Sequence, residues 1–161
     1  MEVMLEIDAH SVEEADIVRR QLDAYNARDI VAFMSFWADD AEVFSWPNTL
    51  VAAGADDIRA RHIERLKEPD LFAELISRVA VGGLVVDREV VTRNFPEGLG
   101  KLDVVGIYES GDGRIRRAWF KQGIPVLQAT KAATSDDRPK VAKLQSIRKT
   151  PGGAGAMHSD G

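Results

Sequence analysis

The stretch FWADDAEVFSWP, residues 36–47, carries the chain from a predicted helix into a predicted strand. Before it, Asp29 can cap a short helix, IVAFMSFW (30–37), whose apolar residues nearly surround the axis, so we expect this helix to be buried. After a pair of acids, AEVFSW (41–46) is typical of a strand that ends at Pro47, which has no N–H to donate to a neighbouring strand. The turn between them either completes a core or delivers a side chain into a pocket.

Helical patterns flank this stretch on both sides. Ser11 followed by Glu14 matches a capping box and predicts a helix over residues 12–26. A third helix is expected over 55–66, stopped by Pro69. The apolar residues of the first helix recur at spacings of three and four, which predicts one buried stripe: Ala15, Val18, Leu22 and Tyr25.

The second half of the chain predicts four consecutive strands. The joints GG, FPEGLG and SGDG are hairpin signals, because glycine supplies the positive φ that tight turns need. Strands joined this closely form an antiparallel meander. The expected fold is therefore α+β, with three N-terminal helices packed into a strongly curved antiparallel sheet. The predicted strands are FAELISRVAVG, LVVDREVVTRN, KLDVVGIYES and RIRRAWFKQ.

The chain divides into three parts. Its 161 residues, 45% of them hydrophobic, suit one core, which we place in residues 11–127. Residues 1–10 are expected to be an N-terminal extension. Residues 124–127 are expected to add a short strand or to lie against the core. Residues 128–161 are expected to be a basic, partly disordered tail, because they lack aromatic residues and end in Gly, Pro, Ala and Ser, with a short helix near 140–147.

Composition excludes several function classes. The net charge is −5, and six of the Lys and Arg residues lie beyond residue 123, so the body of the domain would repel nucleic acid. With no cysteine there is no thiolate nucleophile or Cys-ligated metal. The sequence shows no paired His spacing and no phosphate or dinucleotide motif, so we expect no metal and no cofactor. An acidic N-terminus and the absence of a long apolar run predict a cytoplasmic protein that does not bind membranes.

Four sequence motifs together resemble those of a known family. YNARD (25–29), FWADDAEV (36–43), GADDIRARHIERL (54–66) and GDGRIRRAWF (111–120) resemble the SnoaL-like members of the nuclear transport factor 2-like superfamily, which includes ketosteroid isomerases and polyketide cyclases. The resemblance implies a cone-like fold, closed at one end and open to a pocket at the other. It leaves the activity open, because this fold hosts isomerases, dehydratases, epoxide hydrolases, cyclases and binding modules.

Steroid isomerase chemistry is disfavoured. The resemblance would place that reaction's tyrosine and two acids at Gln21, Ser45 and about Val105. The reaction needs a carboxylate base and two acidic donors for an enolate oxygen, and these three side chains supply no base.

His62, Arg61 and Asp103 are the candidate catalytic residues. By the resemblance, Arg61 and His62 fall where pocket residues lie, so His62 could act as a general acid or base and Arg61 could steady an oxyanion. The alternative is that His62 only bonds Gln21 inside the core. By strand alternation Asp103 lies on the same face as Ile107, and Arg116 on the same face as Phe120. If that face is the concave one, Asp103 and Arg116 point into the pocket, which resembles part of the Asp-Arg-Asp set of epoxide hydrolases. The other interpretation is that the two residues form a salt bridge at the rim.

The remaining predictions concern ligand, pairing and assembly. Substrate-binding candidates are Gln21, Tyr25, Ser45, Trp46, Arg116 and Phe120. Arg78 is expected to pair with Asp87 or Glu89 across a hairpin for structural reasons. Trp119 and Tyr108 are expected on the outer face of the sheet, where large aromatic residues favour a homodimer or another homo-oligomer.

Together these features predict a cofactor-free isomerase, lyase, cyclase or hydrolase that acts by proton transfer on a small hydrophobic cyclic or aromatic molecule. The alternative is a non-catalytic ligand-binding or dimerisation module of the same fold.

Overall fold

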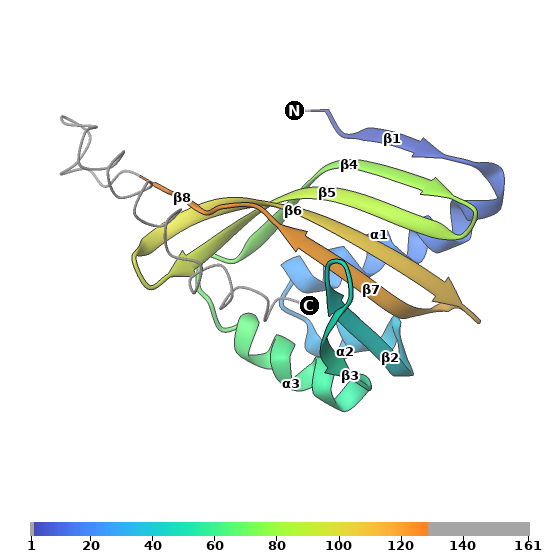
Figure 1. The fold of residues 1–161 in the computed structure, drawn as a ribbon, viewed down its shortest axis with the longest axis horizontal. Coiled ribbons are helices and arrows are strands. Elements are labelled where there is room, and N and C mark those ends of the chain that lie inside the picture. The colour runs from blue at the N-terminus through green and yellow to red at the C-terminus, as the bar shows by residue number, and fades with distance from the viewer. Residues whose placement is uncertain (1, 129–161) are drawn as a thin grey trace.

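The computed structural model describes residues 2–128, so the expected tail helix near 140–147 lies outside the described residues. Three α-helices and a short 3₁₀ helix, Ala9–Ser11, combine with strands of one sheet (Figure 1). The helices are α1 (Val12–Asn26), α2 (Ile30–Ser35) and α3 (Ala55–Arg65). The strands are β1 (Met4–Ile7), β2 (Trp37–Ser45), β3 (Thr49–Ala53), β4 (Phe72–Val81), β5 (Leu84–Phe95), β6 (Gly98–Gly111), β7 (Arg114–Gln122) and β8 (Val126–Leu127).

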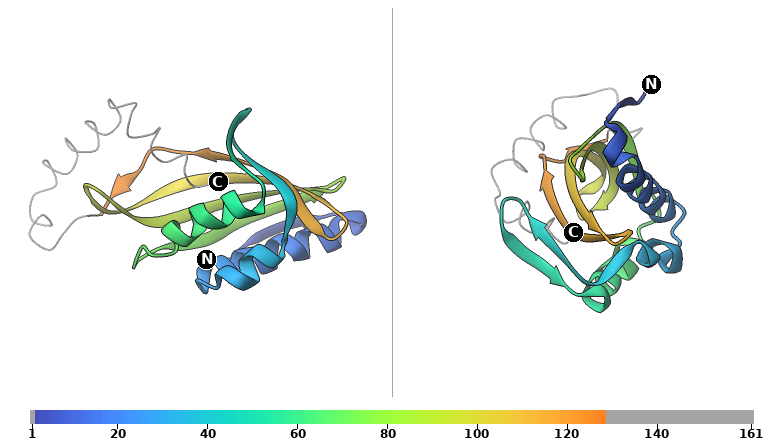
Figure 2. Two further views of the ribbon diagram at one scale, coloured as in Figure 1. Left: turned by 90° about the horizontal axis from the view of Figure 1, so that it is seen from below. Right: turned by 90° about the vertical axis from the view of Figure 1, so that its right-hand side faces the viewer.

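The strands form one curved sheet in the order β1-β4-β5-β6-β7-β2-β3, with β8 added beside β6. The expected four-strand meander is confirmed as β4 to β7. The sheet is mixed and not purely antiparallel, because β1 runs parallel to β4 and β2 runs parallel to β7. The sheet curves around the helices without closing, which confirms the α+β, cone-like fold (Figure 2).

Strand β1 corrects the interpretation of residues 1–10 as an extension. Met4 to Ile7 pair with Ser77 to Ala80 at the edge of the sheet. All four residues of β1 are exposed, so they lack the alternation of apolar and polar residues by which a half-buried strand is recognised. The pairing of β1 with β4 uses backbone groups alone, so the sequence pattern of residues 4–7 did not indicate a strand.

The ends of the helices differ in part from the expected caps. Asp29 caps α2 as predicted, with its carboxylate accepting from the Ala32 N–H at 3.0 Å. The expected capping box at Ser11 is wrong, because the Ser11 hydroxyl accepts instead from the Gly83 N–H of the β4–β5 hairpin at 3.2 Å. Ser11 thus attaches the start of α1 to the sheet.

The opening stretch turns earlier than predicted. Helix α2 ends at Ser35, and Trp37 already pairs with Ile115 of β7. The pairing of β2 with β7 is then interrupted between Trp37 and Glu42, which leaves the acids Asp39 and Asp40 exposed on a bulge. The side chain that this turn places in the interior is Trp37, 2% exposed.

The interior consists of two apolar clusters. One surrounds Phe33 and Trp37 beside α2, and the other surrounds Leu22 and Val104 between α1 and the middle of the sheet. Tyr25 and Phe120 pack against both clusters. The space between the clusters is where these aromatic rings meet polar side chains.

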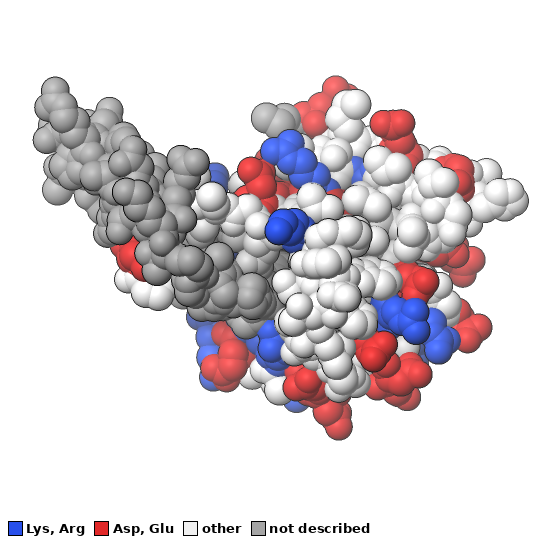
Figure 3. Space-filling view, in the orientation of Figure 1, with Lys and Arg blue, Asp and Glu red and all other residues white. Residues whose placement is uncertain are grey.

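The surface carries mixed charge. On the face in Figure 3, acidic and basic side chains are interspersed and do not form one broad patch. Uncharged atoms dominate over the β2–β3 hairpin, where Trp46 and Leu50 are each 49% exposed. Within residues 2–128, no helix is both long and apolar enough to cross a membrane.

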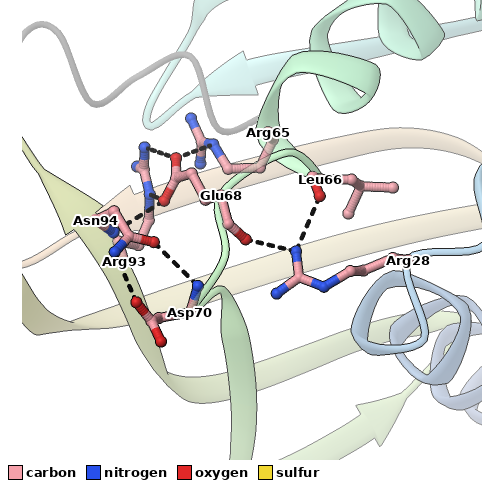
Figure 4. Close-up of polar contacts among 7 residues, drawn as sticks. All are labelled: Arg28, Arg65, Leu66, Glu68, Asp70, Arg93 and Asn94. Carbon is pink, nitrogen blue, oxygen red and sulfur yellow. Dashed lines mark hydrogen bonds and ion pairs between the residues drawn. The ribbon is translucent and has the colours of Figure 1, made fainter.

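Polar bonds fix the loop between α3 and β4 to the rest of the domain (Figure 4). Glu68 accepts from the Arg93 guanidinium at 2.7 Å and from the Asn94 backbone N–H at 3.0 Å, and forms an ion pair with Arg65. Arg28, in a left-handed conformation with φ of 60°, donates to four carbonyl oxygens of the loop: Leu66, Glu68, Pro69 and Leu71. These bonds hold the end of α3 against β5.

Replacing Arg28 by Lys is expected to lower the free energy of unfolding by about 1–3 kcal/mol, because one ammonium group cannot reach all four carbonyls and hydrogen bonds to charged groups are worth this much. Urea denaturation measures the change. Arg19→Lys is the control, since Arg19 pairs with Asp16 and Asp23 on the exposed face of α1 and its loss should cost less than about 1 kcal/mol. Equal losses in both variants would contradict the role given to Arg28.

Candidate functional site

A cavity of about 40 Å³ lies between the helices and the concave face of the sheet. That volume admits a few water molecules, since one needs about 10–15 Å³. The apolar part of its lining is Leu22, Trp37, Val91, Val104 and Phe120. The polar part is Gln21, Tyr25, His62, Glu89, Tyr108 and Gln122.

Strand alternation brings β5 and β6 side chains into this space. On β5, Asp87, Glu89 and Val91 are buried, while Arg88 between them is exposed. On β6, Tyr108 points to the same interior, and Gly106 makes room for it: a Cβ there would lie 3.1 Å from the Tyr108 and Phe120 rings. These two rings meet edge to face, with centroids 5.7 Å apart.

Glu89 is the unusual group of the cavity. Its side chain is 5% exposed, and its Oε2 atom is buried without a hydrogen-bond partner in the structure. Burial, together with the nearby charge of Asp87, raises the pKa of Glu89 to about 8, and Arg78 opposes the rise. At neutral pH the carboxyl therefore keeps its proton and can donate it.

Arg78 and Asp87 form a buried ion pair beside Glu89. Arg78 Nε and Nη2 donate to the two Asp87 oxygens at 2.6 and 2.7 Å, and both side chains are almost fully buried. The expected cross-strand pairing of Arg78 is confirmed with Asp87. This bidentate pair neutralises both charges, so Glu89 has no cation of its own.

His62 lies on the buried stripe of α3 with Ile58 and Arg65. Its Nδ1 lies 2.8 Å from the Ile58 carbonyl oxygen, so Nδ1 carries a hydrogen and donates it to that oxygen. The ring stacks at a tilt on Phe33, with centroids 4.4 Å apart. The helix thus fixes both the position and the ring orientation of His62.

The two tyrosines of the lining have protein partners. Tyr25 is hydrogen-bonded to Arg65. Tyr108 is hydrogen-bonded to Gln21, whose Nε2 also donates to the Val18 carbonyl at 3.3 Å. Burial raises the pKa of Tyr25 to about 12 and the pKa of Tyr108 well above its usual value. Both hydroxyls stay protonated at neutral pH.

The structure places Asp103 and Arg116 away from the cavity, which corrects the expectation that they share its concave face. Asp103 is on the outer face of β6, where its 62% exposed side chain pairs with Arg88 at 3.0 Å. Arg116 is half exposed and pairs with Asp40 and Asp112, not with Asp103. The inner row of β6 is the alternate one, which includes Val104 and Tyr108.

Arg61, Ser45 and Trp46 also lie outside the cavity lining. Arg61 is half-buried on α3, one residue before His62, but it is not among the residues that line the cavity. Ser45 is half-buried at the end of β2, and Trp46 is 49% exposed. Of the residues predicted to bind substrate, the structure brings together Gln21, Tyr25 and Phe120 with His62.

Sequence reasoning did not assign Glu89, Trp37 or Tyr108 to the site. The available signal was VVDREVV (85–91), in which acids interrupt an apolar strand. Valines occur on both alternating faces of this segment, so the pattern alone did not tell which face is buried. Within the described part of the chain, no group of three or more His, Asp or Glu side chains is placed to hold a metal ion.

Comparison with known proteins agrees with the observed fold. The model of the SnoaL-like domain family matches residues 18–118. A nuclear transport factor 2-like protein of unknown function from Mesorhizobium loti is 22% identical and has a TM-score of 0.63 over 74% of this chain and 98% of its own. This likeness shows the fold alone.

Two further structures have names that suggest activities. A protein from Sinorhizobium meliloti, provisionally named a polyketide cyclase, is 26% identical, with a TM-score of 0.54 over 65% of this chain and 93% of its own. A provisionally named hydroxylase from Streptomyces galilaeus is 20% identical, with a TM-score of 0.63 over 87% of this chain and 99% of its own, and shows the fold alone. No curated protein matches this chain significantly.

The raised pKa of Glu89 predicts a pH-dependent stability. Between about pH 4.5 and pH 8 the folded state keeps a proton that the unfolded state has released, so the free energy of unfolding should fall as pH rises through this window and level off above it. The slope is at most about 1.4 kcal/mol per pH unit from this group. Urea denaturation of the native chain and of Glu89→Gln, from pH 5 to pH 9, measures it. A slope that Glu89→Gln leaves intact would contradict the assignment.

The Arg78–Asp87 pair should be far more important to stability than the exposed Arg88–Asp103 pair. Asp87→Asn leaves the Arg78 charge buried without its partner and is expected to cost about 3–5 kcal/mol. Asp103→Asn, in an exposed cross-strand pair, should cost less than about 1 kcal/mol. Denaturation of the two variants at one pH makes the comparison, and similar losses would show that the Asp87 pair is not effectively desolvated.

Proposed function

This chain belongs to the SnoaL-like domain family, and on that premise we propose that it is a cofactor-free acid–base enzyme acting on a small, largely hydrophobic molecule. One observation carries the proposal: the buried Glu89, with a pKa of about 8, lines a largely apolar cavity, and its Oε2 atom has no hydrogen-bond partner in the structure. Structural carboxylates in protein interiors are ordinarily paired. Catalytic groups that exchange protons near neutral pH are commonly buried beside a cavity, where burial shifts their pKa towards neutrality.

Glu89 and His62 supply opposite halves of a proton transfer. At pH 7 Glu89 is protonated and donates, while His62, whose ring is held by the bond between Nδ1 and the Ile58 carbonyl, is assigned the role of proton acceptor. Both side chains line the same cavity. A substrate between them can lose a proton on one side and gain one on the other, which is the step shared by isomerases, lyases and cyclases. Arg61 and Asp103, also expected to be catalytic, have no part in this scheme because they lie outside the cavity.

The family also contains binding modules, and the cavity volume of about 40 Å³ favours this second candidate. A substrate with more than a few heavy atoms needs the half-buried side chains of the lining, Tyr25, Phe120 and Gln122, to move. A ligand carrier would bind with the same polar groups and show no turnover. The expected homodimer or other homo-oligomer stays a prediction. Of the two aromatic residues expected on the outer face, Tyr108 is buried instead, which leaves Trp119, stacked on Phe44, as the residue to probe.

A ligand screen followed by kinetics tests the enzyme proposal. Thermal-shift screening against small cyclic and aromatic metabolites identifies ligands, and NMR then measures their conversion. Glu89→Gln is expected to lower kcat by about 10²–10⁴-fold with little change in KM, because the variant keeps the shape and loses the exchangeable proton. His62→Gln should lower kcat similarly.

The control variants are Arg61→Ala and Asp103→Asn, which should leave kcat within about twofold because neither residue lines the cavity. The native rate should fall as pH rises above about 8, when Glu89 loses its proton. Ligands that bind without conversion would favour the carrier, and full activity in folded Glu89→Gln would remove the proposal.

A further inference from the structure

The polar groups of the cavity fall into two sets. In the first, the protein itself supplies a partner: Tyr108 bonds Gln21, Tyr25 bonds Arg65, and His62 Nδ1 bonds Ile58. In the second are two buried atoms without a partner in the structure, Glu89 Oε2 and Trp37 Nε1. Both residues line the cavity and both are more than nine-tenths buried. The proposed chemistry uses Glu89 and leaves Trp37 unexplained.

Trp37 cannot turn its N–H towards bulk solvent. It is the first residue of β2, it is 2% exposed, and its ring packs on Phe33 with centroids 5.8 Å apart. A buried N–H left without an acceptor destabilises a protein by about 1–3 kcal/mol. An apolar ring of similar size would fill the core as well as the Trp37 indole does and would bury no unpaired N–H. The functional reason for an indole at this position therefore lies in the molecule that occupies the cavity.

The charges around the cavity restrict that occupant. Among the described residues no Lys or Arg lines it. Arg78, beside Glu89, is engaged by Asp87, and Arg65, which is bonded to Tyr25, is paired with Glu68. An anionic ligand would therefore find no counter-ion. At neutral pH Glu89 is mainly protonated, so a cationic ligand would first have to displace that proton. An uncharged oxygen needs no counter-ion and leaves the proton on Glu89. It can accept hydrogen bonds from both the Trp37 indole and the Glu89 carboxyl.

We propose that Trp37 is a specificity-determining residue whose indole N–H binds an uncharged acceptor oxygen of the ligand, of the carbonyl or cyclic ether type, beside Glu89. The inference rests on the proposed function only in placing the ligand in the same cavity; it concerns recognition and not proton transfer. Tyr108, the other large donor of this wall, already has a protein partner in Gln21, whereas the Trp37 N–H has none in the structure.

NMR of the indole groups tests this directly. The chain has three tryptophans, so a ¹H–¹⁵N spectrum assigned with Trp37→Phe, Trp46→Phe and Trp119→Phe identifies the Trp37 N–H. Titration of the native chain with cyclopentanone should move this proton downfield to saturation. Methylenecyclopentane, which has the same ring and no oxygen, should leave it in place or move it upfield.

Affinities provide the second measurement. Trp37→Phe should weaken cyclopentanone binding about five- to tenfold, which corresponds to one lost hydrogen bond, and leave methylenecyclopentane binding within about twofold. Trp119→Phe is the matched control, because Trp119 stacks on Phe44 and does not line the cavity, and should change neither affinity. Cyclopentylammonium and cyclopentanecarboxylate should both bind more weakly than the ketone at pH 7.

The outcomes separate recognition from catalysis. No binding of cyclopentanone, an unmoved Trp37 proton at saturation, or tighter binding of the ammonium probe would each overturn the inference, and the native-chain titration decides this even if Trp37→Phe does not fold. Ketone binding through Trp37 without turnover of any screened compound would support the inference and remove the proposed enzyme. If folded Trp37→Phe retained turnover with an unchanged KM, the proposed enzyme would be supported and the role given to Trp37 would be removed.

Discussion

The inward row of strand β5 is the constraint on which the rest of this structure depends. One strand places three ionisable side chains in the interior, away from bulk solvent, because its inward row is Val85, Asp87, Glu89, Val91 and Arg93. Burial of a charge is costly unless a partner is present. Arg78 supplies the partner of Asp87, and Glu68 supplies that of Arg93. Glu89 alone has none, and it avoids the cost by keeping its proton, which makes it a proton donor at neutral pH.

The two apolar clusters give this carboxyl its surroundings. Phe33 and Trp37 on one side and Leu22 and Val104 on the other leave a small space that Tyr25 and Phe120 border. Gly106 is part of the same arrangement, since any side chain there would press on the Tyr108 and Phe120 rings. The loop that Arg28 and Glu68 fix sits at the end of α3, the helix that holds His62. Supports that lie outside the cavity thus determine the orientation of the groups inside it.

Family membership and chemistry come from different parts of the chain. The SnoaL-like match extends over residues 18–118 and accounts for the helices, the curved sheet and the presence of a pocket. It does not choose a reaction, because proteins of this fold share the frame and differ in the side chains that face the pocket. In this chain those side chains are the protonated carboxyl of Glu89, the imidazole of His62 and the indole N–H of Trp37, which has no hydrogen-bond partner in the structure. The proposed acid–base function and the preference for an uncharged oxygen follow from these groups.

The sequence by itself determined the elements and their order, because hydrophobic periodicity and turn residues are local signals: α1 and α3, the Asp29 cap, the β4–β7 hairpins and the Arg78 pairing were all predictable. It also indicated His62, Gln21, Tyr25 and Phe120 by resemblance. Only the tertiary structure decided which face of each strand is inside. Alternation leaves two equivalent choices, and the direction of the sheet's curvature selected Glu89 and Tyr108 over Asp103. The early start of β2, which buries Trp37, and the exposed strand β1 likewise depend on pairing with β7 and β4, partners distant in the chain that no local pattern records.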